Sequence, residues 1–175
     1  MVAPEFIAFH TDRPQGRQGA HPNANLDSGG YMRMLDMLFR SARLFHPAAT
    51  CVLVTDEQTR VRGVRPPFET RVHEVDHAAI SLSRALAQCA HLASTDFAHP
   101  KVLIDSDILV NRSLAGLFGE DFDVGLTWRK STKMPINGGL IFVNNRRPER
   151  GIEFFRRFVE YYRARSPEQK QWIGD

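Results

Sequence analysis

With 175 residues, of which 42% are apolar and 25% charged, the chain has the composition of one soluble globular domain that is large enough to bury a core. No apolar run approaches the roughly 18 residues of a membrane-spanning helix and no basic signal-peptide start is visible, which predicts a cytoplasmic protein without a transmembrane segment. The basic residues do not alternate with aromatic residues along the sequence, which argues against nucleic acid as a partner. The net charge of +3 suits an anionic small molecule such as a nucleoside diphosphate.

Short apolar runs alternate with segments of helical periodicity along most of the chain. In chain order, the predicted elements are a strand at residues 5–10, a helix at 27–45, strands at 50–55 and 70–75, a helix at 81–94, strands at 101–104, 123–128 and 139–143, and a helix at 149–164. This alternation predicts a single α/β domain over residues 1–175, with a mostly parallel sheet flanked by helices. Cys51 and Cys89 lie in apolar segments, so we expect buried, reduced thiols.

Several predicted strands run directly into an aspartate. Asp12 follows the first strand, Asp56 follows the second, and Asp107 closely follows the strand at 101–104. Because the carboxyl ends of parallel strands meet at one edge of a sheet, and ligands bind outside that edge, these aspartates point to a binding site there. The polar stretch 13–25 behind the first strand has a length that is often functional.

Asp105 and Asp107 are the strongest chemical signal in the sequence. On an extended backbone, residues two apart project on the same side, so two buried carboxylates would repel each other unless a cation neutralised them. Mg²⁺ and Mn²⁺ prefer oxygen ligands and combine one or two carboxylates with phosphate oxygens. The alternative is a surface turn, but the apolar segments 102–104 and 108–110 on either side favour burial.

A second signal is Asn137-Gly138-Gly139, which enters the apolar run 140–143. Two glycines let a ligand approach the main chain closely, although a tight turn explains the same residues. The polar, basic segment 129–135 just before it has the composition of a loop that closes over phosphates, with an ordinary solvated loop as the alternative.

Taken in order, residues 101–110, 114–118 and 137–143 resemble glycosyltransferases of the GT-A fold, most closely family 8, which includes glycogenin and bacterial galactosyltransferases. The specific part is the D-x-D pair behind an apolar strand, followed later by N-G-G and another strand. The resemblance implies a Rossmann-like GT-A fold and a metal-dependent transfer of a sugar, a hexose first of all, from a nucleoside diphosphate sugar. A UDP-sugar is the expected donor, and a saccharide or other compound is the acceptor.

Residue by residue, the resemblance implies that Asp105 and Asp107 bind Mn²⁺ or Mg²⁺, with Asp105 also touching the donor ribose. It implies that the backbone of Ser106 lines the nucleotide pocket. The end of the first strand would cradle the nucleoside through His10, Thr11 and Asp12. These last residues could instead simply end the strand.

Further positions match the parts of the family site that face the diphosphate and the sugar. Arg84 matches a basic residue that contacts the donor, although it lies opposite the apolar stripe of its helix, where a solvated arginine is the alternative. Asn137 and Gly138 match the segment that faces the transferred sugar. Asp175 matches an aspartate near the reacting sugar and is the expected catalytic residue.

The expected mechanism is Lewis-acid catalysis, in which the cation offsets charge on the diphosphate leaving group and Arg84, with Lys130 or Lys133, adds positive charge. The resemblance leans toward retention of configuration. Family members usually continue beyond this point and supply a third metal ligand, often a histidine, together with much of the acceptor site. We therefore expect the chain to be a C-terminally shortened domain.

The residues also allow two functions other than glycosyl transfer. Phosphatases of the haloacid dehalogenase type also place D-x-D behind an apolar strand and use the first aspartate as a nucleophile. Their pair normally lies near the N-terminus, with Thr or Val two residues after it, where this sequence has Leu109. A non-catalytic nucleotide-binding domain is the other alternative, because the chain is short.

Overall fold

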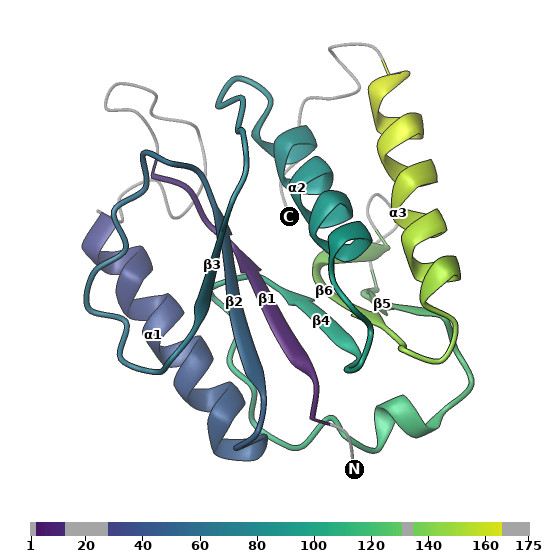
Figure 1. Cartoon of the computed structure of the whole chain (residues 1–175), viewed down its shortest axis with the longest axis horizontal. Helices are drawn as coiled ribbons and strands as arrows, with labels where there is room; N and C mark the ends of the chain where they lie inside the picture. Colours follow the sequence, from purple (N-terminus) through teal and green to yellow (C-terminus); the bar gives the residue numbers. More distant parts are fainter. Residues whose placement is uncertain (1–2, 13–27, 131–134, 166–175) are drawn as a thin grey trace.

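A computed structural model describes residues 3–12, 28–130 and 135–165 (Figure 1). Within these ranges the elements are, in chain order, β1 (Glu5–Phe9), α1 (Ser28–Phe45), β2 (Thr50–Thr55), β3 (Glu69–Val72), α2 (Ile80–Ser94), β4 (Lys101–Ile104), the 3-10 helix η1 (Leu117–Gly119), β5 (Val124–Trp128), β6 (Ile136–Val143) and α3 (Pro148–Arg163). No helix of this described part is long and apolar enough to cross a membrane.

The strands form one six-stranded sheet in the order β3-β2-β1-β4-β6-β5. The pairs β3–β2, β2–β1 and β1–β4 are parallel, whereas β6 runs antiparallel to both β4 and β5. The prediction of a mostly parallel α/β sheet flanked by helices is confirmed. Parallel pairing places the residues behind β1, β2 and β4 at one edge, as the alternation of elements predicts.

Two strands differ from the prediction. β6 begins at Ile136 rather than Gly139, because Asn137 pairs with Thr127 of β5 and extends the ladder past a register shift between Leu126 and Thr127. β3 ends at Val72 instead of residue 75. All four residues of β3 are exposed at the sheet edge, so no pattern of burial marks where that strand stops.

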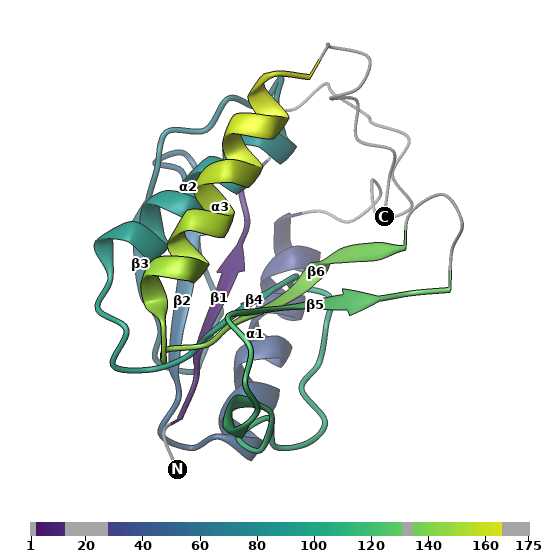
Figure 2. The same cartoon turned by 90° about the vertical axis from the view of Figure 1, so that its right-hand side faces the viewer.

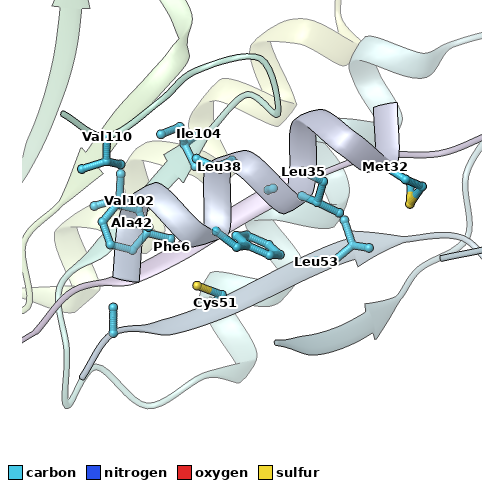
Figure 3. Packing of buried hydrophobic residues seen from close by; sticks show 13 residues of the cluster. Phe6, Met32, Leu35, Leu38, Ala42, Cys51, Leu53, Val102, Ile104 and Val110 are labelled. Carbon is cyan, nitrogen blue, oxygen red and sulfur yellow. The ribbon is translucent and has the colours of Figure 1, made fainter. Parts of the chain in front are cut away.

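Helix α1 covers one face of the sheet, and α2 with α3 cover the other (Figure 2). Side chains alternate between the faces along β1, so that Phe6 packs with the α1 cluster and Ile7 with the cluster on the opposite face. Figure 3 shows Leu35 and Leu38 of α1 packed against the strand residues of the first cluster. One buried cluster thus lies on each face of the sheet.

The order of the strands reverses between β1 and β4. From β1 the chain passes through α1 to β2 on one side, whereas β4 lies on the other side, with Ala8 paired to Ile104. In sheets of this kind such a topological switch point opens a crevice outside the carboxyl ends of the two strands, and ligands bind there. The residues that directly follow Phe9 and Ile104 therefore flank the most favourable binding position of the fold.

A buried charged cluster lies at the opposite ends of the same two strands. Lys101 is fully buried at the start of β4, and its Nζ lies 3.1 Å from Oε2 of Glu5 at the start of β1. The other oxygen of Glu5 lies 3.0 Å from Nε2 of His91 on α2. Thr95 accepts a further hydrogen bond from Lys101, at 3.3 Å. The apolar pattern of residues 101–104 did not reveal this cluster, because its partners come from distant segments.

Candidate functional site

Asp105 and Asp107 belong to a turn and not to an extended strand. β4 ends at Ile104, and the amide of Ile108 donates a hydrogen bond to the carbonyl oxygen of Asp105 at 3.1 Å. Asp105 is half-buried and Asp107 is exposed. The expectation that both carboxylates project on the same side of an extended backbone is therefore wrong, because Asp105 and Asp107 are the first and third residues of a turn that Ile108 closes. Ser106, between the two, is half-buried.

Arg84 of α2 reaches this turn. Its Nη2 lies 2.7 Å from Oδ1 of Asp105 and donates a hydrogen bond to the carbonyl oxygen of Gly138 at 3.0 Å. Only 25% of the arginine side chain and 24% of the aspartate side chain is exposed. Arg84 is thus turned toward the carboxyl end of β4 and is not a solvated arginine. It supplies a positive charge for Asp105 from within the chain.

Gly139 lies directly beside the carboxylate of Asp105. Its carbonyl oxygen accepts a hydrogen bond from the amide of Asp105 at 2.8 Å, and its own amide donates to Oδ1 of Asn137 at 2.9 Å. A Cβ atom at this position would stand 2.5 Å from Oδ2 of Asp105. A side chain at this position would therefore push against the carboxylate, which approaches the main chain closely here. Gly138, by contrast, is exposed and has open space around it.

A second polar group follows β1. His10 and Thr11 are buried, and Nε2 of His10 lies 3.5 Å from Oδ1 of Asp12. The ring of Tyr31 on α1 lies beside that of His10, with centroids 5.1 Å apart. Burial lowers the pKa of His10 below its usual value, although the charges of Asp12 and Asp56 oppose the shift. His10 is consequently a neutral, buried ring at the edge of the sheet near neutral pH.

The structure gathers the predicted site residues into two groups at the ends of adjacent strands. Arg84, Asp105, Asn137 and Gly138 lie together where β4 ends and β6 begins. The second group follows β1 and consists of His10, Thr11 and Asp12. Lys130 is exposed just beyond β5. The loop 13–25, Lys133 and Asp175 lie outside the described residues.

Sequence reasoning missed the residues that hold Asp12. Its amide donates a hydrogen bond to Oγ1 of Thr59 at 2.9 Å, and the hydroxyl of Thr59 donates to Oδ1 of Asp56 at 2.6 Å. Oδ2 of Asp56 lies 2.8 Å from Nε2 of His77. The spacing of Asp56 and Thr59, in which an aspartate accepts from the backbone three residues on, is a local turn signal that would have shown part of this arrangement.

The same edge offers limited means of holding a metal. Within the described ranges no three His, Cys, Asp or Glu side chains are grouped in a way that could hold a metal ion. At this edge the described residues therefore offer a metal ion at most two carboxylate ligands, those of Asp105 and Asp107. That set suits Mg²⁺ or Mn²⁺, which complete their coordination with substrate phosphate oxygens and water, better than it suits a metal that needs an all-protein cage.

Solved glycosyltransferase structures share this architecture. The galactosyltransferase LgtC, solved in complex with donor and acceptor sugar analogs, superimposes with a TM-score of 0.56 at 14% identity, over 95% of this chain and 68% of its own. GlyE from Streptococcus pneumoniae TIGR4 gives 0.56 at 13% identity, over 98% of this chain and 42% of its own. A glycosyltransferase involved in glycosylation of the major capsid of PBCV-1 gives 0.52 at 14% identity, over 98% of this chain and 76% of its own.

No protein-family model and no curated protein matches the sequence. The chain has the α/β fold of the GT-A glycosyltransferases. It spans about two thirds of the LgtC chain and less than half of the GlyE chain. At 13–14% identity the likeness establishes the fold, and the activity must be argued from the site.

Proposed function

We propose that this chain binds a nucleoside diphosphate sugar, a UDP-sugar first of all, and takes part in transferring its glycosyl group, a hexosyl group in the first instance, to a saccharide or other acceptor. One observation carries the proposal. His10 and Asp105, one from each group of predicted site residues, directly follow β1 and β4, the neighbouring strands at which the order of the sheet reverses. The fold favours ligand binding at that position, and the same fold occurs in the glycosyltransferase structures above.

The nucleoside end of the donor belongs, in this proposal, beyond β1. His10 and Thr11 are buried there, and Asp12 offers a carboxylate as an acceptor for N–H or hydroxyl groups. Asp105 follows the adjacent strand, and in this proposal it contacts the ribose or the diphosphate. The backbone of Ser106 would line the same pocket.

The diphosphate belongs at the turn beyond β4. Asp105 and Asp107 would hold Mn²⁺ or Mg²⁺, which when bound bridges diphosphate oxygens and offsets the charge of the leaving group. Arg84 is held in place by Asp105 and Gly138 and contributes a fixed positive charge beside the same oxygens. Lys130 and Lys133 are further candidates for phosphate contacts.

The transferred sugar belongs near Asn137 and Gly138. Gly138 is exposed with open space where a Cβ atom would stand, and the carboxylate of Asp105 lies close to the main chain at Gly139. Asp175, as the residue near the reacting sugar, and retention of configuration remain predictions from the family resemblance.

The two alternatives differ from this proposal in what they would turn over. A haloacid-dehalogenase-type phosphatase needs its first aspartate free to attack phosphorus, whereas Asp105 is paired with Arg84 and follows the fourth strand. Hydrolysis of a generic phosphate monoester without hydrolysis of a nucleotide sugar would favour the phosphatase. Binding of a nucleoside diphosphate without any turnover of its sugar would favour a binding domain.

The test is a calorimetric or thermal-shift screen of nucleoside diphosphate sugars with and without Mn²⁺. We expect at least one donor to stabilise the protein in a metal-dependent way, and we expect Asp107→Asn to abolish that dependence. Asp121→Asn is the matched control, because Asp121 is an exposed aspartate paired with Arg147 away from the site. Absence of donor binding, or binding that ignores the metal, would contradict the proposal.

A further inference from the structure

We infer that Thr59, in the loop between β2 and β3, is a positioning residue that fixes Asp12 for binding of the donor nucleoside. The inference rests on the proposed function, since it concerns the nucleoside end of the same site. It adds a residue that lies far from Asp12 in the sequence and makes no direct contact with donor in this proposal.

The hydroxyl of Thr59 has both of its hydrogen-bonding roles assigned. Its oxygen accepts a hydrogen bond from the amide of Asp12 at 2.9 Å, and its proton is donated to Oδ1 of Asp56 at 2.6 Å. The amide of Thr59 donates to the same carboxylate oxygen at 2.8 Å. Because the hydroxyl donates to Asp56 and accepts from Asp12 at the same time, its O–H bond is held in one direction. The hydroxyl thereby ties the backbone of Asp12 to the end of β2.

The next residue along the loop holds the side chain of Asp12. The amide of Arg60 donates a hydrogen bond to Oδ2 of Asp12 at 3.1 Å. Oδ1 of Asp12 is buried without a hydrogen-bond partner among the described residues, 3.5 Å from the similarly unpartnered Nε2 of His10. A buried polar atom without a partner is costly, so within the described residues these two atoms favour a polar contact, for which a ligand or a water molecule would serve.

Asp56 anchors the arrangement from the other side. It is buried at the end of β2, and its Oδ2 lies 2.8 Å from Nε2 of His77, which follows β3. Burial alone would raise the pKa of Asp56, but hydrogen bonds from Thr59 and His77 lower it overall, so the carboxylate stays charged near neutral pH. The Thr59 hydroxyl therefore joins the end of β1 to the end of β2, and the carboxylate of Asp56 continues the link to His77. Loss of that hydroxyl removes the bond to the Asp12 amide and leaves Asp12 held by Arg60 alone in this loop.

UDP, GDP, ADP, CDP and dTDP are first titrated into the wild-type protein in the presence of Mn²⁺. The nucleotide that binds most tightly is then used to compare the affinities of the variants. We expect Thr59→Val to weaken binding about tenfold and Thr59→Ser, which keeps the hydroxyl, to stay within about threefold of the wild type. Thr95→Val is the matched control, because Thr95 loses a hydroxyl that contacts Lys101 at the opposite end of the sheet. Its affinity should equal that of the wild type.

A double-mutant cycle separates positioning from general destabilisation. If Thr59 acts through Asp12, Thr59→Val should have no further effect on affinity in an Asp12→Ala background. Wild-type affinity in Thr59→Val, failure of Thr59→Ser to restore binding, or additive effects in the cycle would overturn the inference while leaving the proposed function intact. If the wild type binds none of the five nucleotides, the proposed function fails and this inference fails with it.

Discussion

The guanidinium of Arg84 lies 2.7 Å from the carboxylate of Asp105, so a helix residue provides a counter-charge for an aspartate at the end of β4. Sequence reasoning assigned that neutralising role to a metal ion. Because Arg84 supplies a positive charge, Asp105 can remain charged in its half-buried position without a bound metal ion. A cation and Arg84 would then share Asp105, and both would face the diphosphate of the proposed donor.

This relationship predicts the effect of removing Arg84. Arg84→Ala should weaken metal-dependent donor binding about tenfold, or about 1.4 kcal/mol, because a fixed positive charge beside the diphosphate is lost. Arg84→Lys should recover only part of this, since the ammonium group of a differently shaped side chain would have to take the place of Nη2, which contacts both Asp105 and Gly138. Titration calorimetry measures both. Arg157→Ala, which removes an exposed arginine paired with Glu153 on α3, is the control and should leave affinity unchanged.

Gly139 should not tolerate a side chain. The Cβ atom of Gly139→Ala would stand 2.5 Å from Oδ2 of Asp105, so either the strand or the carboxylate must move. We expect a loss of about 1–3 kcal/mol in the free energy of unfolding, together with weaker donor binding. Gly116→Ala is the control, because nothing lies within 4 Å of its added Cβ. Urea unfolding of the two variants should separate them clearly, and equal stability would contradict this account.

The buried cluster of Glu5, Lys101 and His91 predicts a pH dependence of stability. Burial alone would raise the pKa of Glu5, but the hydrogen bond from His91 and the charge of Lys101 outweigh it and lower that pKa below its ordinary value of 4.5. A carboxyl group with a lowered pKa in the folded state stabilises the protein above about pH 4.5 and loses this contribution as the pH falls through the folded value.

Glu5→Gln tests this dependence. At pH 7 the free energy of unfolding of the variant should be about 3 kcal/mol lower than that of the wild type, because the buried Lys101 loses its counter-charge. The difference should shrink as the pH falls below about 4.5 and through the lowered pKa of Glu5 in the folded wild type. Unfolding curves across this range measure the gap, with Glu69→Gln at an exposed pair as the control. A gap that stays constant with pH would show that Glu5 stabilises the fold by packing and not by its charge.

The two cysteines should differ in reactivity. Cys51 is buried in β2, and burial raises the pKa of its thiol to about 11, whereas Cys89 on α2 is half-buried with a pKa that burial raises less. Because the thiolate is the reactive form, both should resist alkylation of the native protein at pH 7.5, with Cys89 reacting first. Mass spectrometry after timed iodoacetamide treatment measures the order, and both thiols should react readily in urea.

The expectation of two buried cysteines holds for Cys51 alone. Cys89 lies at a position of α2 where the helix is only partly covered. The apolar segment around it correctly predicted a helix, but apolar periodicity identifies the side of a helix that faces the core and leaves open how far its margins are exposed.

The local pattern of the sequence determined most of the secondary structure. Strands β1, β2 and β4 and helices α1, α2 and α3 lie within a residue or so of their predicted positions, because burial of an apolar face imposes a period that neighbouring residues reveal. The same pattern placed aspartates behind three strands, and parallel pairing then brought those ends to one edge of the sheet. The resemblance to GT-A enzymes added the fold, which the shared architecture with LgtC and GlyE supports.

Tertiary structure alone decided the contacts that join these ends. The contact between Arg84 and Asp105, the hold of Thr59 on Asp12, and the burial of Lys101 beside Glu5 each link residues that are distant along the chain. Local periodicity carries no information about such pairs, since the order of the strands determines which ends become neighbours. The turn at Asp105 and the early start of β6 have the same origin, because pairing with an adjacent strand sets where a strand begins and ends.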